Sequence, residues 1–283
     1  MEDKQTAVKS REEKKEALGR VIDVLNELRV KCPWDAKQTN ESLRANTVEE
    51  VYELCDAIIN DSNEDIKKEL GDVLLHVLFY AKIGEEKGAF DIVYVCDALV
   101  NKLVYRHPHV YGQVKADTAG QVVQNWEQLK LKEKGGNRSV LAGVPGALPA
   151  LIKAYRIQEK AANAGFDWEK PEDVWEKVKE EVAEFSAEAT KAAKEAAQNA
   201  DGKISEEQKA RMESEMGDVF FSLVNAARLY SIQPENALEK TNKKFINRFN
   251  HIEEGARAKG VTLSEMSLAE MDALWDEAKT ETK

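Results

Sequence analysis

The sequence has few cysteines, few prolines and no long apolar run, and each absence excludes a class of protein. Its 283 residues include three cysteines and six prolines, and no two cysteines form a CxxC pair, so a reducing, cytoplasmic environment is expected. No apolar run approaches the roughly 18 residues of a transmembrane helix. The N-terminal stretch MEDKQTAVKSREEKKE also lacks the apolar core of a secretory signal. We therefore expect a soluble protein with no membrane partner.

The sequence also has fewer basic residues than acidic ones. Lys and Arg number 41 against 52 Asp and Glu, which gives a formal net charge of −11. Proteins that bind nucleic-acid polymers neutralise phosphates with Lys and Arg. The balance argues against such a partner, but it leaves room for a small basic pocket that binds a free nucleotide.

Helical periodicity dominates what the sequence does contain. Charged residues make up 33% and hydrophobic ones 42%, and apolar residues recur three and four positions apart. The Gly- and Pro-rich stretch KGGNRSVLAGVPGALP marks a linker at 135–149 between an N-terminal domain, 18–134, and a C-terminal domain, 150–283. The pattern predicts an all-α fold with helices near residues 11–30, 41–61, 64–87, 91–106, 118–134, 147–163, 171–199, 204–231, 234–259 and 267–280.

The two halves contain the same motifs in the same order. EExxE, ExxD and KxxxR occur twice, which a duplicated helical unit explains better than chance. The second copy has a longer interval within the Ala- and Lys-rich stretch 185–210, which predicts a longer helical hairpin there. The acids and bases concerned are Glu50, Glu53, Glu69, Asp72, Lys102 and Arg106 in the first half, and Glu181, Glu184, Glu215, Asp218, Lys244 and Arg248 in the second.

The second-half acids have the pattern of a metal cage. Residues three or four apart share a helix face, so Glu181 projects with Glu184. Glu215 projects with Asp218 for the same reason. EEVAE alone is typical of a solvated acidic face, but EMGDVFF is apolar on its other faces. Gly217 costs about 1 kcal/mol relative to alanine inside a helix, and we interpret it as room for a close neighbouring helix or ligand. Two facing helices would bring four carboxylates together, an environment preferred by hard divalent cations such as Mg²⁺, with Mn²⁺ as an alternative.

Basic residues that could hold a phosphorylated substrate accompany these acids. TNKKFINRF places Asn242, Lys244 and Arg248 at helical spacing, either as a solvated basic face or as a clamp for phosphate oxygens. Lys177 and Arg211 each lie one turn before an acid of the cage and could add positive charge at its rim. The bases therefore complete a site for an anionic ligand.

Three other residues have less specific patterns. Trp275 lies on the last amphipathic helix, either as a core anchor or as a stacking surface for a base. His107 and His109, in RHPHVYG, have no Cys or acid partner at the spacing of a zinc site, so a turn or packing role is expected for them.

Together these motifs resemble the MazG family of nucleoside triphosphate pyrophosphohydrolases. The resemblance extends from about residue 18 to 280 and rests on CPWDAKQT, EEVYE, KELGDVLLHVLFYAKI and YRHPHVYG in the first half. In the second half it rests on KAANAGFDW, EEVAE, EMGDVFFSLVNAAR and TNKKFINRF. It implies a tandem repeat of two all-α, MazG-like helical bundles and a homodimer with intertwined helices. It also implies Mg²⁺-dependent cleavage of NTP or dNTP to nucleoside monophosphate and pyrophosphate.

The resemblance assigns roles to individual residues. Metal ligation falls on Glu181, Glu184, Glu215 and Asp218, and nucleotide contacts fall on Lys177, Arg211, Lys244, Arg248 and Trp275. A metal-activated water would attack the α-phosphorus, with either Glu180 or Glu181 orienting or deprotonating it.

The first-half acids and bases could form a second, weaker site. Asn46 and Asp65 stand there in place of Lys177 and Arg211, so one rim cation is missing and an acid replaces the other. The competing function is a non-catalytic helical dimer that senses nucleotides or regulates another protein. The ordered set of acids and bases favours the enzyme.

Overall fold

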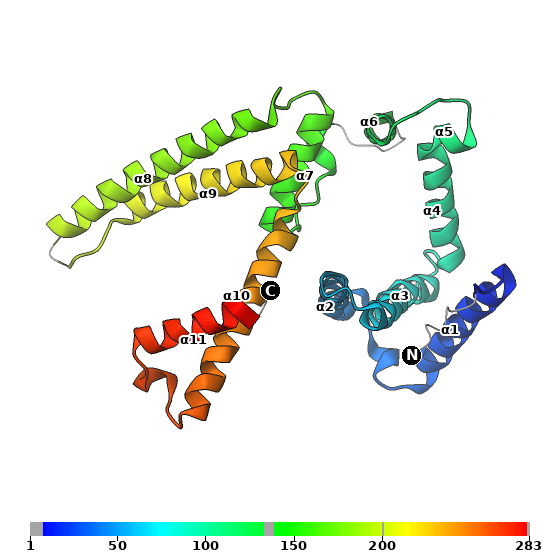
Figure 1. Ribbon diagram of the computed structural model, residues 1–283. Coiled ribbons are helices and arrows are strands. Elements are labelled where there is room, and N and C mark those ends of the chain that lie inside the picture. Colours follow the sequence, from blue (N-terminus) through cyan, green and yellow to red (C-terminus); the bar gives the residue numbers. More distant parts are fainter. Residues whose placement is uncertain (1–7, 133–138, 200, 282–283) are drawn as a thin grey trace. The chain divides into compact units, whose positions relative to one another are not determined.

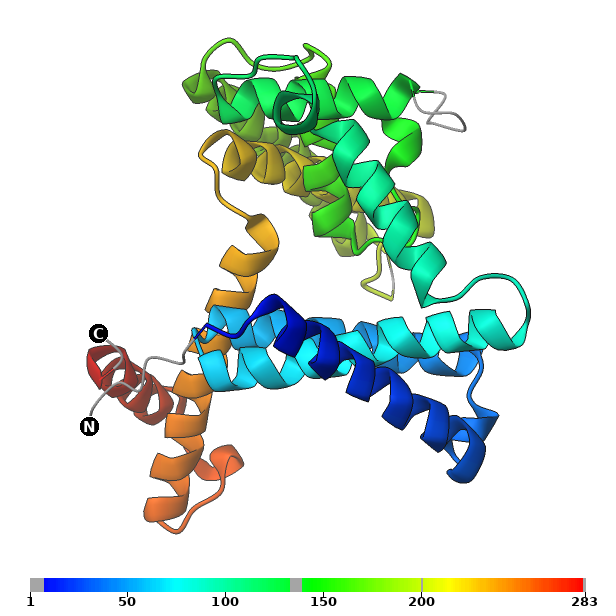
Figure 2. The same cartoon turned by 90° about the vertical axis from the view of Figure 1, so that its right-hand side faces the viewer.

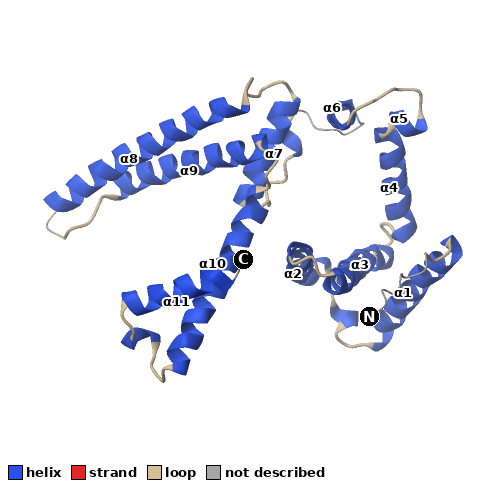
Figure 3. Ribbon diagram, in the orientation of Figure 1, coloured by secondary structure: helices blue, strands red, loops and turns tan. Residues whose placement is uncertain are grey.

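The computed structural model describes residues 8–132, 139–199 and 201–281, and these ranges contain helices and loops but no strand (Figure 3). The all-α expectation is confirmed. The chain divides into two compact units, Met1–Ala116 and Asp117–Lys283, and each unit is described by itself. Part of the expected linker, 135–149, lies outside the described residues, and the domain limits at 134 and 150 stay a prediction.

Among the described residues, the first unit has five α-helices and the second has six, and Figure 1 shows their arrangement within each unit. None of the described helices is both long and apolar enough to cross a membrane. The first unit contains α1 (Arg11–Lys31), α2 (Asn40–Ile59), α3 (Asn63–Glu86), α4 (Ile92–Arg106) and the short α5 (Pro108–Tyr111). The second contains α6 (Ala119–Lys132), α7 (Ala150–Asn163), α8 (Val174–Gln198), α9 (Glu206–Leu229), α10 (Pro234–Ala258) and α11 (Leu268–Glu281).

Capping residues set several of the helix starts. Ser10 and Glu13 form a reciprocal capping box at α1, in which each side chain accepts from the other's backbone N–H. Ser205 accepts from the backbone N–H of Gln208 at the start of α9. The helix predicted near 171–199 begins three residues later, because Pro171 opens a 3₁₀ turn and α8 starts at Val174.

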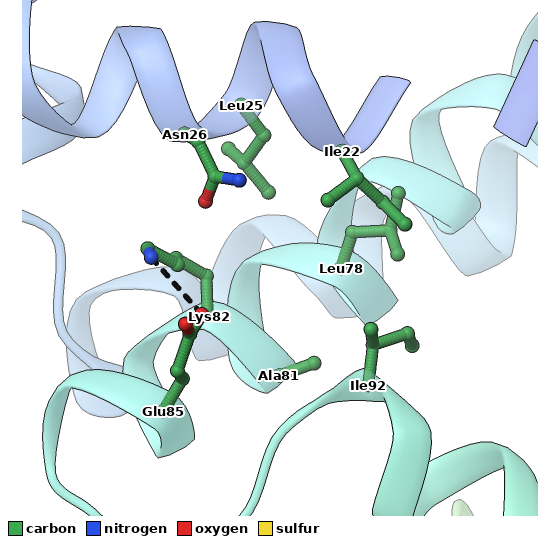
Figure 4. A pocket seen from close by; sticks show the side chains of 8 residues that line it. All are labelled: Ile22, Leu25, Asn26, Leu78, Ala81, Lys82, Glu85 and Ile92. Carbon is green, nitrogen blue, oxygen red and sulfur yellow. Dashed lines mark hydrogen bonds and ion pairs between the residues drawn. The ribbon is translucent and has the colours of Figure 1, made fainter. Parts of the chain in front are cut away.

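The first unit packs α1 and α2 against α3, which Figure 2 shows in blue and cyan. Its core is made of Leu25, Leu43, Leu78, Phe79 and Ile83, all no more than 5% exposed. A cavity of about 30 Å³ lies beside this core, with mostly apolar walls and the Lys82–Glu85 ion pair on one side (Figure 4). It is the size of about one water molecule, which is too small for a substrate or cofactor.

Arg29 ties α1 to the rest of the first unit. Its guanidinium donates to the backbone oxygens of Asp35 and Gln38, which belong to the CPWDAKQ segment. It also pairs with Glu86 at the end of α3, with 3.0 Å between Nε and Oε1. One partly buried arginine therefore holds the segment after α1 and the end of α3 together.

The second unit is built on a long hairpin of α8 and α9, the light green and yellow helices of Figure 1. It extends through 185–210, as the Ala- and Lys-rich composition predicted. Gln208 is 2% exposed and joins the two helices, since its Nε2 donates to the backbone oxygen of Glu188 at 2.9 Å. Nearer the base of the hairpin, Val174 and Val178 pack against Ala226.

The last two helices, α10 and α11, pack closely on each other. A Cβ on Gly255 would lie 2.5 Å from Cδ1 of Leu274, so any larger residue here would force the Leu274 side chain to move. Trp275 of α11 contacts Phe245 of α10 edge-on, with ring centroids 5.1 Å apart. These contacts hold Trp275, a residue of α11, against the surface of α10.

Candidate functional site

The second-half acids meet between the two helices of the hairpin. Glu181 and Glu184 project from α8 and Glu215 projects from α9, and one carboxylate oxygen of each lies within 4.8 Å of the others. Glu181 is buried and Glu215 is half-buried. Asp218, one turn after Glu215, adds to the negative charge acting on it. The structure thus brings three of the four predicted ligands into one cluster and places the fourth beside it.

The cluster has more negative charge than its surroundings neutralise. Burial, followed by repulsion from Glu184, Asp218 and Glu181, raises the pKa of Glu215. Lys177 is the nearby cation, and its Nζ lies 2.8 Å from Glu181 and 3.0 Å from Glu180. Hydrogen bonds to these two carboxylates raise the pKa of Lys177. One lysine does not neutralise this group of acids, and an oxygen-only cluster with excess negative charge fits a hard divalent cation.

A cavity of about 640 Å³ opens beside the cluster. Glu181, Asp218 and Lys177 belong to its lining, so the cavity and the acid cluster share side chains. Most of the remaining wall is apolar or aromatic. The other residues that line it are Leu141, Ile157, Gln158, Ala161, Phe166, Asp167, Trp168, Val174, Phe221, Ser222, Asn225 and Arg228.

The first half holds a second carboxylate cluster, between α2 and α3. Oxygens of Glu50, Glu69 and Asp72 lie within 4.8 Å of one another. Burial, followed by repulsion from Asp72, Glu53 and Glu69, raises the pKa of Glu50. Glu69 is 5% exposed, and its Oε2 is buried without a hydrogen-bond partner among the described residues. Both halves therefore gather acids of the repeated motifs between two paired helices. The ExxD aspartate, Asp72, belongs to the closest three in the first half, whereas Glu184 takes that place in the second half.

Lys68 is a cation of the first cluster that the sequence comparison missed. Its Nζ lies 2.8 Å from Oε1 of Glu69, whereas the expected rim positions hold Asn46 and Asp65. The residue matching Lys68 in the second half is Ser214, so matching motif positions between the halves could not find it. Its position next to Glu69 in KKEL was the available signal.

The predicted phosphate and base contacts lie on other helices. Asn242 donates to Glu239, and Lys244 is exposed on α10. The Arg248 guanidinium lies over the Trp275 ring, 5.5 Å from its centroid. None of these four predicted contacts lines the cavity beside Glu181. Within the described part of the chain, the structure does not bring α10 and α11 to the acid cluster.

The remaining predicted cations have other surroundings. Arg211 pairs with Glu207 at 2.7 Å and donates to Gln208, toward the far part of the hairpin. Lys102 and Arg106 lie on α4, whereas the first acid cluster is formed by α2 and α3. In both units, therefore, the KxxxR residues lie on a helix other than the two that form the acid cluster.

The close neighbouring helix expected at Gly217 is absent from the described chain, whereas the alternative of a ligand there stays a prediction. A Cβ placed on Gly217 would meet no atom within 4 Å, and the same holds for Gly71 in the first half. The neighbouring helix approaches another face of α9, so no side chain is excluded at this position. Any close approach at Gly217 must come from outside the described chain.

The fold and the clusters define a class: an all-α protein of two units, each with carboxylates gathered between paired helices. The family model of the MazG nucleotide pyrophosphohydrolase domain matches residues 38–111 and 169–253. The two matches contain the two acid clusters, which confirms the tandem arrangement. The chain belongs to the MazG nucleotide pyrophosphohydrolase family.

Similar proteins extend the match over most of the chain. It is 40% identical to the nucleoside triphosphate pyrophosphohydrolase/pyrophosphatase MazG of Thermotoga maritima, over 92% of this chain and 94% of that protein. It is 37% identical to a nucleoside triphosphate pyrophosphohydrolase of Escherichia coli, over 93% and 97% of the two chains. It is also 47% identical to a protein of Bacillus subtilis named YabN, over 88% of this chain and 48% of that one.

Proposed function

We propose that this protein hydrolyses nucleoside triphosphates and deoxynucleoside triphosphates to the monophosphate and pyrophosphate. The observation that carries the proposal is the cluster of Glu181, Glu184 and Glu215, in which Glu181 is buried and the charge is incompletely neutralised. The cluster lies in the family-matched region 169–253 and opens onto a cavity of about 640 Å³. A metal-assisted hydrolase of an anionic substrate uses this combination.

We assign the metal to the same carboxylates. Glu181, Glu184 and Glu215 would hold Mg²⁺ or Mn²⁺, with Asp218 as the fourth acid. When bound, such a cation neutralises phosphate charge and lowers the pKa of a coordinated water. The raised pKa of Glu215 supports the assignment, because a bound cation would relieve the carboxylate repulsion that contributes to the rise.

Two neighbouring glutamates, Glu180 and Glu181, have different roles in the proposed reaction. Glu181 is buried in the cluster, whereas Glu180 is exposed, and Lys177 contacts both. We therefore propose that Glu180 orients or deprotonates the attacking water, since Glu181 is committed to the cluster. Attack at the α-phosphorus releases pyrophosphate, and Lys177 stabilises the charge that develops there.

We propose a homodimer that completes the site. Arg248 and Trp275 do not line the cavity of their own chain, and α8 and α9 expose Val182, Phe220 and Leu223, each more than two-fifths exposed. A second subunit packed on this face would bury these side chains and could supply the cations. In this proposal Arg211, Asn242, Lys244, Arg248 and Trp275 contact the nucleotide across the dimer, and the chemistry resides mainly in the C-terminal domain, 150–283.

Pyrophosphate release from each NTP, measured with and without Mg²⁺, tests the activity. The expected products are monophosphate and pyrophosphate, formed only when the metal is present. In water enriched in the heavy oxygen isotope, the label should enter the monophosphate and not the pyrophosphate. Diphosphate and free phosphate as products would place the attack at the γ-phosphorus and overturn the proposal. Undiminished turnover in excess EDTA would overturn the metal assignment.

A further inference from the structure

The far part of the α8–α9 hairpin has no counterpart in the first unit. There α2 ends at Ile59 and α3 begins at Asn63, whereas α8 continues to Gln198 and α9 begins at Glu206 (Figure 1). Among the described residues, neither the acid cluster nor the cavity beside it includes a residue of 185–210. The metal site alone therefore does not explain why the second hairpin is longer.

Gln208 lies at the centre of this extension, and its side-chain amide is fully hydrogen-bonded. It is 2% exposed. Its Nε2 donates to the backbone oxygen of Glu188 at 2.9 Å and to Oε2 of the same residue at 3.0 Å. Its Oε1 accepts from Nε and Nη2 of Arg211, at 3.2 and 3.0 Å. Because both N–H groups and both lone pairs of the amide are engaged, its orientation is fixed.

Arg211 is held along one edge of its guanidinium. Gln208 accepts from Nε and Nη2, and Glu207 accepts from Nη1 at 2.7 Å. Glu188 adds its charge, with 3.7 Å between its Oε2 and Nε of Arg211. A guanidinium has five N–H groups, so one on each Nη has no acceptor among the described residues. The side chain is 50% exposed, and these two N–H groups suit two oxygens of a phosphate.

This network is present in the second half and absent as a set from the first. The three matching positions of the first half, found from the spacing of the repeated motifs, are Ala57, Ser62 and Asp65. Ser62 is the N-cap of α3, so the first hairpin ends where the second one builds the network. The residues that hold the cation therefore occur only in the half that has the cation.

We propose that Gln208 and Glu188 are positioning residues that orient Arg211 toward the phosphates of the nucleotide. The inference rests on the proposed function, in which Arg211 contacts the nucleotide, and it gives the longer hairpin a role. A mobile arginine loses side-chain entropy when it binds an anion, and the network removes part of that loss before the ligand arrives. Gln208 acts through Arg211 and is not itself catalytic.

Binding of inorganic pyrophosphate, measured by calorimetric titration with Mg²⁺ present, tests the inference without turnover. Gln208→Met keeps roughly the size of the side chain and removes its hydrogen bonds to Arg211. We expect pyrophosphate to bind about tenfold more weakly to this variant. Gln198→Met makes the same chemical change at the exposed end of α8 and should leave the affinity unchanged.

A double-mutant cycle with Arg211→Ala separates positioning from a purely structural role. Arg211→Ala should weaken pyrophosphate binding at least as much as Gln208→Met does. Adding Gln208→Met to Arg211→Ala should then cause no further loss, because the guanidinium through which Gln208 acts is already gone. Equal losses with and without Arg211 would overturn the inference, as would wild-type affinity in Arg211→Ala.

Glu188→Gln keeps the test decisive if circular dichroism shows that Gln208→Met does not fold. It preserves the shape of the side chain and removes the charge beside Arg211, so pyrophosphate should bind about threefold more weakly. Wild-type affinity in every folded variant of Gln208 and Glu188 would overturn the inference, as would a wild-type chain that binds no pyrophosphate. A wild-type chain that binds pyrophosphate but does not release it from NTPs would instead reject the proposed function.

Discussion

At the scale of single residues, Glu215 lies among carboxylates that repel it, and in the proposed function a bound cation would relieve that repulsion. Its raised pKa means that the folded chain pays for keeping it ionised among other carboxylates. Glu215→Gln should therefore raise the thermal midpoint of the metal-free protein in EDTA at pH 7. It should also abolish the further rise produced by Mg²⁺, which differential scanning fluorimetry measures.

Glu213→Gln is the matched control for Glu215→Gln. Glu213 is exposed on the same helix and lies outside the cluster. It should change neither the metal-free midpoint nor the response to Mg²⁺. A lower metal-free midpoint for Glu215→Gln than for wild type would show that the carboxylates do not repel each other.

The Arg29–Glu86 pair gives a pH-dependent contribution to stability. The hydrogen bond from Arg29 holds the pKa of Glu86 below its ordinary value of 4.5. A depressed carboxyl pKa stabilises the fold above that ordinary value, and this contribution is lost as the pH falls through the folded-state pKa. Glu86→Gln should cost up to about 1 kcal/mol at pH 7, because Arg29 loses its ion pair with a partly exposed carboxylate but keeps its bonds to the backbone oxygens of Asp35 and Gln38. In urea titrations the gap from wild type should shrink below pH 4.5; a gap that stays constant would contradict the pair's role.

At the scale of helices, the two kinds of glycine should respond oppositely to alanine. At Gly217 the added methyl group meets open space, so Gly217→Ala should stabilise the isolated subunit by about 1 kcal/mol. Gly71→Ala should do the same in the first half. Gly255→Ala should destabilise, because its Cβ would meet Leu274 at 2.5 Å. Urea denaturation at low protein concentration measures all three, and a loss of stability at Gly217 would indicate that a second subunit packs there.

The helices were predictable, but some of their contacts were not. Three-and-four periodicity predicted α8 and α9, because each helix needs a buried apolar face. The predicted start of α8 was three residues too early, because Pro171 opens a 3₁₀ turn. The same spacing paired Glu181 with Glu184, since that relation is local. The sequence also predicted Asp218 as a ligand equivalent to the other three acids. Its position beside the cluster depends on how α8 crosses α9, and the sequence of neither helix determines that crossing. Lys68 and Gln208 escaped notice because their importance comes from contacts or burial formed only in the folded units.

At the scale of the whole molecule, the two halves should contribute unequally to turnover. Glu215→Gln combined with Asp218→Asn should lower kcat/KM by roughly a hundredfold or more. Glu69→Gln combined with Asp72→Asn should leave most of the activity. The reason is charge: Lys68, the cation at the first cluster, has a side chain that is 66% exposed, and Asp65 adds an acid where the second half has Arg211.

Circular dichroism on both double variants separates lost chemistry from lost structure. If both variants are folded and the first-half pair lowers kcat/KM more than the second-half pair does, the active site lies in the N-terminal unit.

The α8–α9 hairpin also has a consequence for the order in which the chain folds. Its two helices are joined by the short segment 199–205, so they meet at a small cost in loop-closure entropy. Contacts this local form early in folding. The carboxylates are then forced together before the rest of the second unit can compensate for their repulsion. Early closure of the hairpin should be slower at neutral pH than in mild acid, and Mg²⁺ added during refolding should accelerate it.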